Sequence, residues 1–290
     1  MRFVILGDLH YSFYLSRRLS TLRDEFYTRL FERVAAIQAD AVFFIGDVSH
    51  TSQTSELVGL REIAHRAGVR HYYMVNGNHD LFRLTPEKVA QYNDNPQPSY
   101  FALHLDEQGQ AQPSAQPNTK SFLVLNTAQY AKPLDTAGLI DPKQLDWLAQ
   151  QVDLSQRDEP LFVLGHHPLY NLTKWASLAH LSIRNSSAVW EALAQKREGV
   201  GFYFCGHNHT NSQARRENWV AIQTAAPLVS LGFRLVEVKE QCIETSLIEI
   251  GGGEKVARAA LLLSVTQANI TNFLSGEVPM VAQKPLRISW

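Results

Sequence analysis

The stretch Phe3-Val4-Ile5-Leu6-Gly7-Asp8-Leu9-His10 joins a short apolar run to a turn that carries a carboxylate and an imidazole. A short apolar run that ends in turn residues is typical of a buried strand. Four later stretches repeat this arrangement: residues 41–45 before Gly46-Asp47, 71–75 before Asn76-Gly77-Asn78-His79-Asp80, 161–164 before Gly165-His166-His167-Pro168, and 201–205 before Gly206-His207-Asn208-His209. Because α/β folds bind ligands at the carboxyl ends of their strands, the five turns predict one shared site.

Helical patterns between these runs predict parallel strands. Apolar residues recur at three- and four-residue steps through residues 15–38 and again through 55–67. Two strands joined by such a helix form a βαβ unit, and its strands are parallel. The later runs 219–223, 232–239 and 242–250 alternate in the manner of antiparallel strands. We therefore expect an α/β fold in which two mixed sheets pack together and are flanked by helices.

Composition favours a globular protein with a small-molecule partner. The chain has 290 residues, of which 45% are hydrophobic, so it can bury a large core. Its net charge of −1 does not favour nucleic acid or an anionic membrane, and the pair Arg215-Arg216 is interpreted as a solvated turn. No apolar run approaches the ~20 residues of a membrane span and no leader is recognised, so we expect a cytoplasmic protein without a membrane partner.

The residue types in the five turns are those that bind transition metals. The candidate ligands are Asp8, His10, Asp47, Asn78, His166, His207 and His209. A glycine precedes the first ligand of every turn, where a side chain would crowd the backbone or an ion. Carboxylates with imidazoles and no thiolate favour manganese, iron or zinc. Two such ions ~3.5–4 Å apart would clamp a phosphate and acidify a bridging water, which suits hydrolysis of a phosphate ester.

In this order, the five motifs resemble those of the calcineurin-like metallophosphoesterases, a superfamily that includes purple acid phosphatases and cyclic nucleotide phosphodiesterases. The resemblance runs from Asp8 to His209 and implies a four-layer αββα sandwich with a dinuclear metal site. It implies one ion on Asp8, His10, Asp47 and His209, and a second on Asp47, Asn78, His166 and His207. It also implies that His79, steadied by Asp80, is the general acid, while a metal-bound hydroxide attacks phosphorus in line.

Two positions help to place the chain within the superfamily. His50 stands three residues after Asp47, where the phosphoserine/threonine phosphatases have Asp and the purple acid phosphatases have Tyr. Asp80 stands where the protein phosphatases have Glu. The chain thus looks more like the bacterial phosphodiesterase branch, which implies a small phosphodiester substrate such as a cyclic nucleotide, a glycerophosphodiester or a nucleotide pyrophosphate. The alternatives are a phosphomonoesterase with the same site and a non-catalytic scaffold.

Domain organisation and four further side chains complete the expectations. We expect a catalytic domain over residues 1–250 and a C-terminal appendage over residues 251–290. His50 has three interpretations: a metal-proximal imidazole, a substrate contact or an exposed turn residue. His167 either touches phosphate or packs beside Pro168, His180 either faces the substrate or is structural, and Arg83 either reaches a substrate anion or is a solvated side chain, which we favour.

Overall fold

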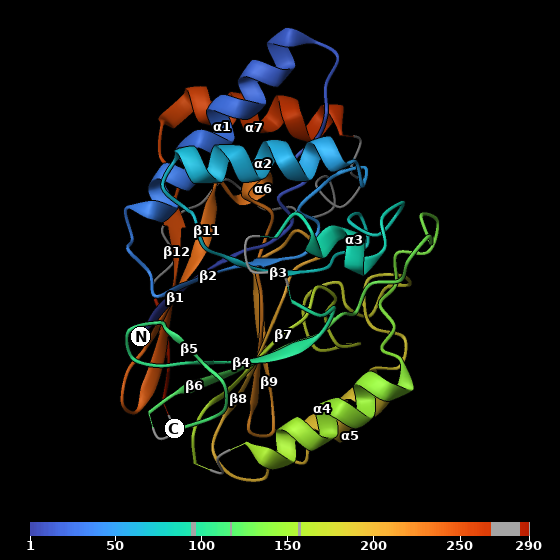
Figure 1. The fold of residues 1–290 in the computed structure, drawn as a ribbon, viewed down its shortest axis with the longest axis vertical. Coiled ribbons are helices and arrows are strands. Elements are labelled where there is room, and N and C mark those ends of the chain that lie inside the picture. Colours follow the sequence, from blue (N-terminus) through green and yellow to red (C-terminus); the bar gives the residue numbers. More distant parts are fainter. Residues whose placement is uncertain (94–96, 117, 156–157, 268–284, 290) are drawn as a thin grey trace.

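The fold is that of two mixed β-sheets between layers of helices, as expected for an α/β protein (Figure 1). The computed structural model describes residues 1–93, 97–116, 118–155, 158–267 and 285–289. Of the expected C-terminal appendage, residues 268–284 and 290 lie outside the described residues. No helix among the described residues is long and apolar enough to cross a membrane.

The first sheet is built around the strand of the opening motif. Its order is β13-β12-β11-β1-β2-β3, in which β1, β2 and β3 are parallel and β11, β12 and β13 are antiparallel. The strands are β1 (Arg2–Leu6), β2 (Ala41–Ile45), β3 (Tyr73–Val75), β11 (Gly232–Val238), β12 (Cys242–Glu249) and β13 (Leu286–Ser289). Helices α1 (Arg17–Ala35) and α2 (Thr54–Arg66) are the predicted crossovers, and with α7 (Gly253–Thr266) they lie on one side of the molecule (Figure 1).

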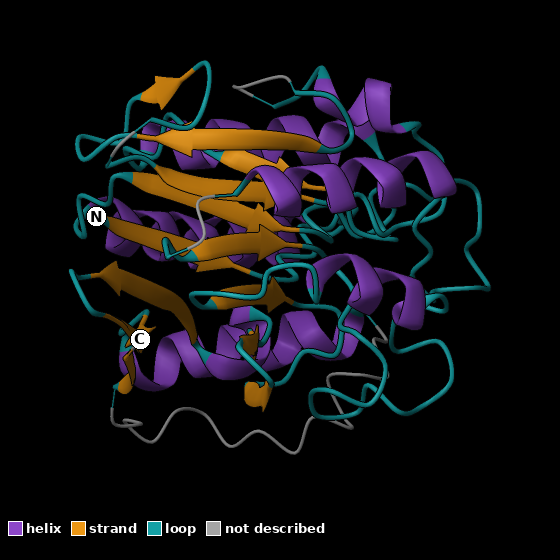
Figure 2. Ribbon diagram, turned by 90° about the horizontal axis from the view of Figure 1, so that it is seen from below, coloured by secondary structure: helices purple, strands orange, loops and turns teal. Residues whose placement is uncertain are grey.

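The second sheet has the order β5-β4-β6-β7-β8-β10-β9. Its strands are β4 (Phe101–Leu105), β5 (Ala111–Gln112), β6 (Lys120–Val124), β7 (Leu161–Leu164), β8 (Gly201–Cys205), β9 (Ser212–Arg216) and β10 (Trp219–Gln223). Helices α4 (Pro142–Leu154) and α5 (Ser186–Leu193) lie on the outer face of this sheet (Figure 2). Two short helices, α3 (Pro86–Ala90) and α6 (Pro227–Ser230), connect other elements.

Aromatic side chains fill the space between the two sheets. The ring of Phe3 on β1 meets those of Phe122, Phe162 and Phe204 edge to face, with centroids 5.2, 5.5 and 5.8 Å apart. All four side chains are fully buried. Such pairs add about 0.5–1.5 kcal/mol each beyond the burial of their area. These contacts hold β1 of the first sheet against β6, β7 and β8 of the second.

The edge of the second sheet differs from the prediction. Residues 219–223 form β10, which is antiparallel to β9 but parallel to β8. Arg215 and Arg216, interpreted as a solvated turn, belong to the edge strand β9. An edge strand has one side open to solvent, so it can carry charged residues, and its sequence then resembles a polar turn.

The segment after residue 250 packs against the first sheet. Helix α7 buries Val256, Ala260 and Leu263 in the same apolar cluster as α1 and α2. The carboxamide of Gln267, at the end of α7, donates a 2.7 Å hydrogen bond to the backbone carbonyl of His10. The C-terminal segment thus reaches the first ligand turn, while the domain boundary after residue 250 stays a prediction.

Candidate metal centre

The five turns meet where the carboxyl ends of the two sheets lie side by side. Within the first sheet, the backbone N–H of His10 donates to the carbonyl of Asp47 across 2.7 Å. Within the second, the N–H of Gly206 donates to the carbonyl of His166 across 2.9 Å. The N–H of His207 donates to both carboxylate oxygens of Asp8, at 2.9 and 3.0 Å, and so joins the two sheets.

Two of the predicted glycines are required by close approach. A Cβ on Gly77 would lie 2.1 Å from the backbone nitrogen of Asp47. A Cβ on Gly46, whose φ is +93°, would lie 2.3 Å from Nδ1 of His166. Neither contact is sterically possible, so any side chain at these positions would displace a candidate ligand.

Backbone conformation is unusual at the candidate ligands. Residues with positive φ are Asp8 (50°), His10 (47°), Asp47 (50°), His207 (69°) and His209 (51°). This left-handed region is uncommon for residues other than glycine, and such conformations concentrate at functional sites because the surrounding structure must hold them. We infer that the backbone of these turns sets the direction of the candidate ligand side chains.

One group of ligand atoms comes from β1, β2 and β8. Nε2 of His10 lies 2.9 Å from Nε2 of His209 and 3.7 Å from Oδ2 of Asp47. Nε2 of His209 lies 3.5 Å from Oδ1 of Asp8. Asp8, His10 and His209 offer one atom each within 4.8 Å of one another, and all three are buried. These atoms face a common point as ligands of one ion do.

A second group comes from β2, β3, β7 and β8. Nε2 of His166 lies 3.3 Å from Oδ2 of Asp47, 3.1 Å from Oδ1 of Asn78 and 3.3 Å from Nδ1 of His207. The opposite nitrogens of both rings face backbone carbonyls: Nδ1 of His166 lies 3.0 Å from Ile45 O, and Nε2 of His207 lies 3.0 Å from His180 O. A metal-binding histidine commonly donates its other N–H in this way, which fixes the ring.

Burial and neighbouring charges divide the ligands by protonation. Burial raises the pKa of Asp8 to about 8, and the charge of Asp47 adds to this. Burial would also raise the pKa of Asp47, but His166, His79 and His10 outweigh it and hold that pKa well below its usual range. Burial would lower the pKa of His166, yet Asp47 and Asp8 raise it to about 9.

Two other ligand imidazoles have lowered pKa values. Burial, reinforced by the charge of His166, lowers the pKa of His207 to about 3. Burial lowers the pKa of His10 well below its usual value, with His79 adding to the effect. Neutral imidazoles can bind a metal ion without first losing a proton.

The donor set fits metal ions. The two carboxylates are buried, and their ion-pair partners among the described residues are histidines of the same cluster. Buried carboxylates facing imidazole nitrogens at 3.3–3.7 Å lower their electrostatic energy when a cation lies between them. Mixed oxygen and nitrogen donors suit zinc, manganese or iron, so the chemistry of the cluster is that of a transition-metal site.

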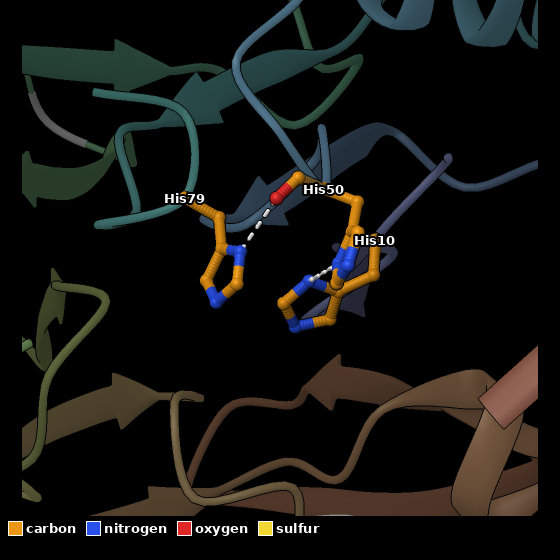
Figure 3. Close-up of side chains that lie close together, drawn as sticks. All are labelled: His10, His50 and His79. Carbon is orange, nitrogen blue, oxygen red and sulfur yellow. Dashed lines mark hydrogen bonds between the residues drawn. The ribbon is translucent and has the colours of Figure 1, made fainter. Parts of the chain in front are cut away.

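His79 lies at the edge of this cluster, and its hydrogen-bond partner differs from the one expected. Nδ1 of His79 lies 2.6 Å from the backbone carbonyl of His50, so its N–H donates a hydrogen bond to that carbonyl (Figure 3). The hydrogen bonds of Asp80 go to other groups, so the expectation that Asp80 steadies His79 stays a prediction. Asp80 is fully buried and accepts hydrogen bonds from Val48 N, Ser49 N, Ser49 Oγ and Gly77 N at 2.8–3.3 Å. It holds the Asp47 turn to the Asn78 turn.

Three of the residues left open by the sequence have defined environments. Both ring nitrogens of His167 lie 2.8 Å from protein oxygens, Thr127 Oγ1 and Thr136 O, so the buried ring is structural. The ring of His180 is exposed and pairs with Asp135, whereas its carbonyl holds His207. Arg83 is exposed, as predicted for a solvated side chain.

Residue types do not reveal the backbone groups that orient the histidine rings of the site. The carbonyls of Ile45, His50, Thr136 and His180 contact the rings of His166, His79, His167 and His207, in that order. Every residue has a carbonyl, so its use carries no signal in residue identity. The usual requirement that a ligating histidine have a second partner could have predicted that such groups exist, but not which ones they are.

Comparisons with known proteins agree with this geometry. A family model described as calcineurin-like phosphoesterase matches residues 1–211. A dimetal phosphatase from Danio rerio superposes with a TM-score of 0.64 at 14% identity, over 87% of this chain and 96% of that chain. GAP50, described as the anchor in the inner membrane complex of Plasmodium, superposes with a TM-score of 0.54 at 12% identity, over 98% of both chains. At these identities the superpositions show the fold alone, and no curated protein sequence matched the chain.

Proposed function

The chain belongs to the calcineurin-like phosphoesterase family, and from this premise we propose that it is a dinuclear metal-dependent hydrolase of small phosphodiesters. One observation carries the proposal. Six buried side chains place carboxylate, amide and imidazole atoms around a seventh, Asp47, whose Oδ2 lies between the rings of His10 and His166. Such a donor set suits two ions that share a carboxylate.

The two groups of ligand atoms divide naturally around Asp47. The proposed ligands of the first ion are Asp8, His10, Asp47 and His209, and those of the second are Asp47, Asn78, His166 and His207. His10, His166 and His209 would bind through Nε2, whereas His207 would bind through Nδ1, because its Nε2 faces the carbonyl of His180. Manganese, iron and zinc are all compatible with this set.

The ions would supply positive charge at the phosphate oxygens and lower the pKa of a bound water molecule. The protein's own contribution is rigidity. Asp8 and Asp47 are held by the N–H groups of His207 and His79, and His166 and His207 by backbone carbonyls. Ligands fixed in this way need no reorganisation when charge develops on phosphorus, which is how a preorganised site lowers a barrier.

His79 is the proposed general acid, acting through Nε2. Its Nδ1–H donates to the carbonyl of His50, so as an acid the ring would have to carry a second proton, on Nε2, and would transfer that one. The side chain is only partly buried, unlike the metal ligands, so it can meet a bound substrate. A proton delivered there would neutralise the departing alkoxide, and such assistance contributes about 10²–10⁴ in rate.

Exposed apolar side chains beside the site favour a diester over a monoester. Loop 169–185 contacts the ligand His207 through the carbonyl of His180. The carbonyl of Thr136, in loop 126–140, contacts His167, whose ring packs on those of His166 and His207. The two loops expose Tyr130 (50%), Leu134 (96%), Tyr170 (58%), Trp175 (36%) and Leu178 (44%). A diester carries a second organic group that could lie against such a surface, whereas a monoester has only a leaving group.

A panel of substrates with manganese tests the proposal. It compares bis-aryl and mono-aryl phosphates of the same phenol with cyclic AMP, a glycerophosphodiester and a nucleotide diphosphate ester. We expect a higher kcat/KM for the bis-aryl than for the mono-aryl ester. The opposite order would support the monoesterase. No turnover of any substrate by protein that retains metal would support a scaffold, since the fold also occurs in a protein described as an anchor.

A further inference from the structure

His50 contacts two members of the cluster at once. Its Nδ1 lies 3.4 Å from Nδ1 of His10, and its backbone carbonyl accepts from Nδ1 of His79 (Figure 3). Its ring is stacked on that of His79, with centroids 5.2 Å apart and planes 22° apart. It meets the ring of His10 at 71°, with centroids 5.5 Å apart. His50 itself is neither a proposed metal ligand nor the proposed acid.

The two facing nitrogens define their own tautomers. Nε2 of His10 faces Asp47 and His209, so His10 would bind the first ion through Nε2 and carry its proton on Nδ1. The partner atom, Nδ1 of His50, must then be an unprotonated acceptor. Ligation at Nε2 withdraws charge from the ring and makes Nδ1–H a stronger donor, which favours this hydrogen bond.

A third ion between His10, His50 and His79 is the competing interpretation, because atoms of all three rings lie within 4.8 Å of one another. Such an ion would need both nitrogens of His10 to act as ligands, and therefore an imidazole that has lost both protons. In addition, Nδ1 of His79 donates a hydrogen bond to the carbonyl of His50, so that nitrogen is not free to bind an ion. The geometry is that of a hydrogen-bonded chain.

We propose that His50 is a positioning residue that accepts a hydrogen bond from Nδ1 of His10 and so fixes the ring that binds the first metal ion. This inference rests on the proposed ligation by His10. Residue 50 thereby links the two parts of the site: its ring orients a metal ligand, and its carbonyl orients the proposed acid. The hydrogen bonds described here do not join His50 to Asn78, His166 or His207, the proposed ligands of the second ion.

Two variants of equal shape isolate the hydrogen bond. In His50→Asn, the amide oxygen can take the place of Nδ1 as acceptor. In His50→Leu, a methyl group of similar size takes that place and accepts nothing. Both variants keep the backbone carbonyl that holds His79. A third variant, His50→Phe, keeps a ring beside His10 and His79 without the acceptor, so that folding failure of one variant does not end the test.

Two quantities are measured on the 290-residue chain. One is the affinity for manganese, by chelator competition, and the other is the visible spectrum of the cobalt-loaded protein. We expect His50→Leu and His50→Phe to weaken one of the two metal equivalents by about 10–100-fold, as loss of an outer-shell partner commonly does. His50→Asn should restore both the affinity and the cobalt spectrum toward wild type. The exposed His71→Leu serves as the matched control and should change neither.

Two results would overturn the inference. One is wild-type affinity for both equivalents in His50→Leu. The other is equal weakening in His50→Asn and His50→Leu, which would reduce His50 to a packing role. These outcomes are separate from failure of the proposed function: protein that binds two ions but hydrolyses no phosphate ester would refute the activity while leaving the effect of His50 on metal binding measurable.

Discussion

The backbone N–H of His79 donates a hydrogen bond to Oδ1 of Asp47 across 2.7 Å. This contact fixes one carboxylate oxygen and leaves Oδ2 facing His166 and His10, at 3.3 and 3.7 Å. The residue proposed to share the two ions is therefore held by the residue proposed to donate the proton. Because the contact uses the backbone of His79, the side chain of His79 can be removed without breaking this hydrogen bond.

This arrangement predicts that His79→Ala retains metal but loses proton transfer. We expect kcat to fall by about 10²–10⁴ for esters with alkyl leaving groups, which need protonation. Activated aryl esters, whose phenolates leave without a proton, should lose much less. The measurement is kcat for a series of diesters of increasing leaving-group pKa, and an equal loss across the series would contradict the acid role.

The buried carboxylate of Asp80 should matter for stability as well as turnover. It accepts hydrogen bonds from the backbone N–H groups of Ser49 and Gly77. In Asp80→Asn, one of these accepting oxygens becomes an NH₂ group, which faces another donor and cannot accept. We expect the free energy of unfolding of the metal-free protein to fall by about 1–3 kcal/mol in urea titrations. The exposed Asp146→Asn is the control and should stay within about 0.5 kcal/mol of wild type. Equal stability of the two variants would argue against the proposed link between turns.

Metal binding should release protons. Burial raises the pKa of Asp8 to about 8, and the carboxylates of Asp47 and Asp8 outweigh burial to raise that of His166 to about 9. Both groups therefore carry a proton at pH 7 in the metal-free protein, whereas metal ligands must be deprotonated. Affinity should rise from pH 6 to pH 9.

Calorimetric titration with manganese at pH 7, in two buffers of different ionisation enthalpy, measures this effect. We expect release of about two protons as both sites fill. Identical binding enthalpies in the two buffers, together with an affinity independent of pH, would show that these two groups are not ligands in the proposed protonation states.

Much of the fold and the location of the site could be predicted from sequence, because both depend on local patterns. The apolar runs before Gly7 and Gly46 became β1 and β2, and their turns meet those of β7 and β8. Strand ends and helix periodicity can be recognised from residue types. Gly46 and Gly77 correctly indicated a close approach of the backbone to a candidate ligand.

What could not be predicted depends on contacts between distant segments. The acidic side chain beside His79 in sequence, Asp80, bonds elsewhere, and His50 supplies a carbonyl in its place. Strand β10 lies between β8 and β9, parallel to β8 and antiparallel to β9. Residue alternation within β10 does not reveal which strand is its parallel neighbour. Nor does residue type reveal the positive φ of Asp8 or Asp47, which neighbouring turns impose.

The central claim is that the seven side chains hold two metal ions that share Asp47. It is tested most directly by metal analysis of the purified protein after reconstitution with manganese, beside the variant Asp47→Ala. The account predicts close to two equivalents in the wild type, and loss of both bound metal and turnover in the variant, because the shared ligand is missing. Wild-type protein that retains close to no metal, or a variant that still holds two ions, would contradict it.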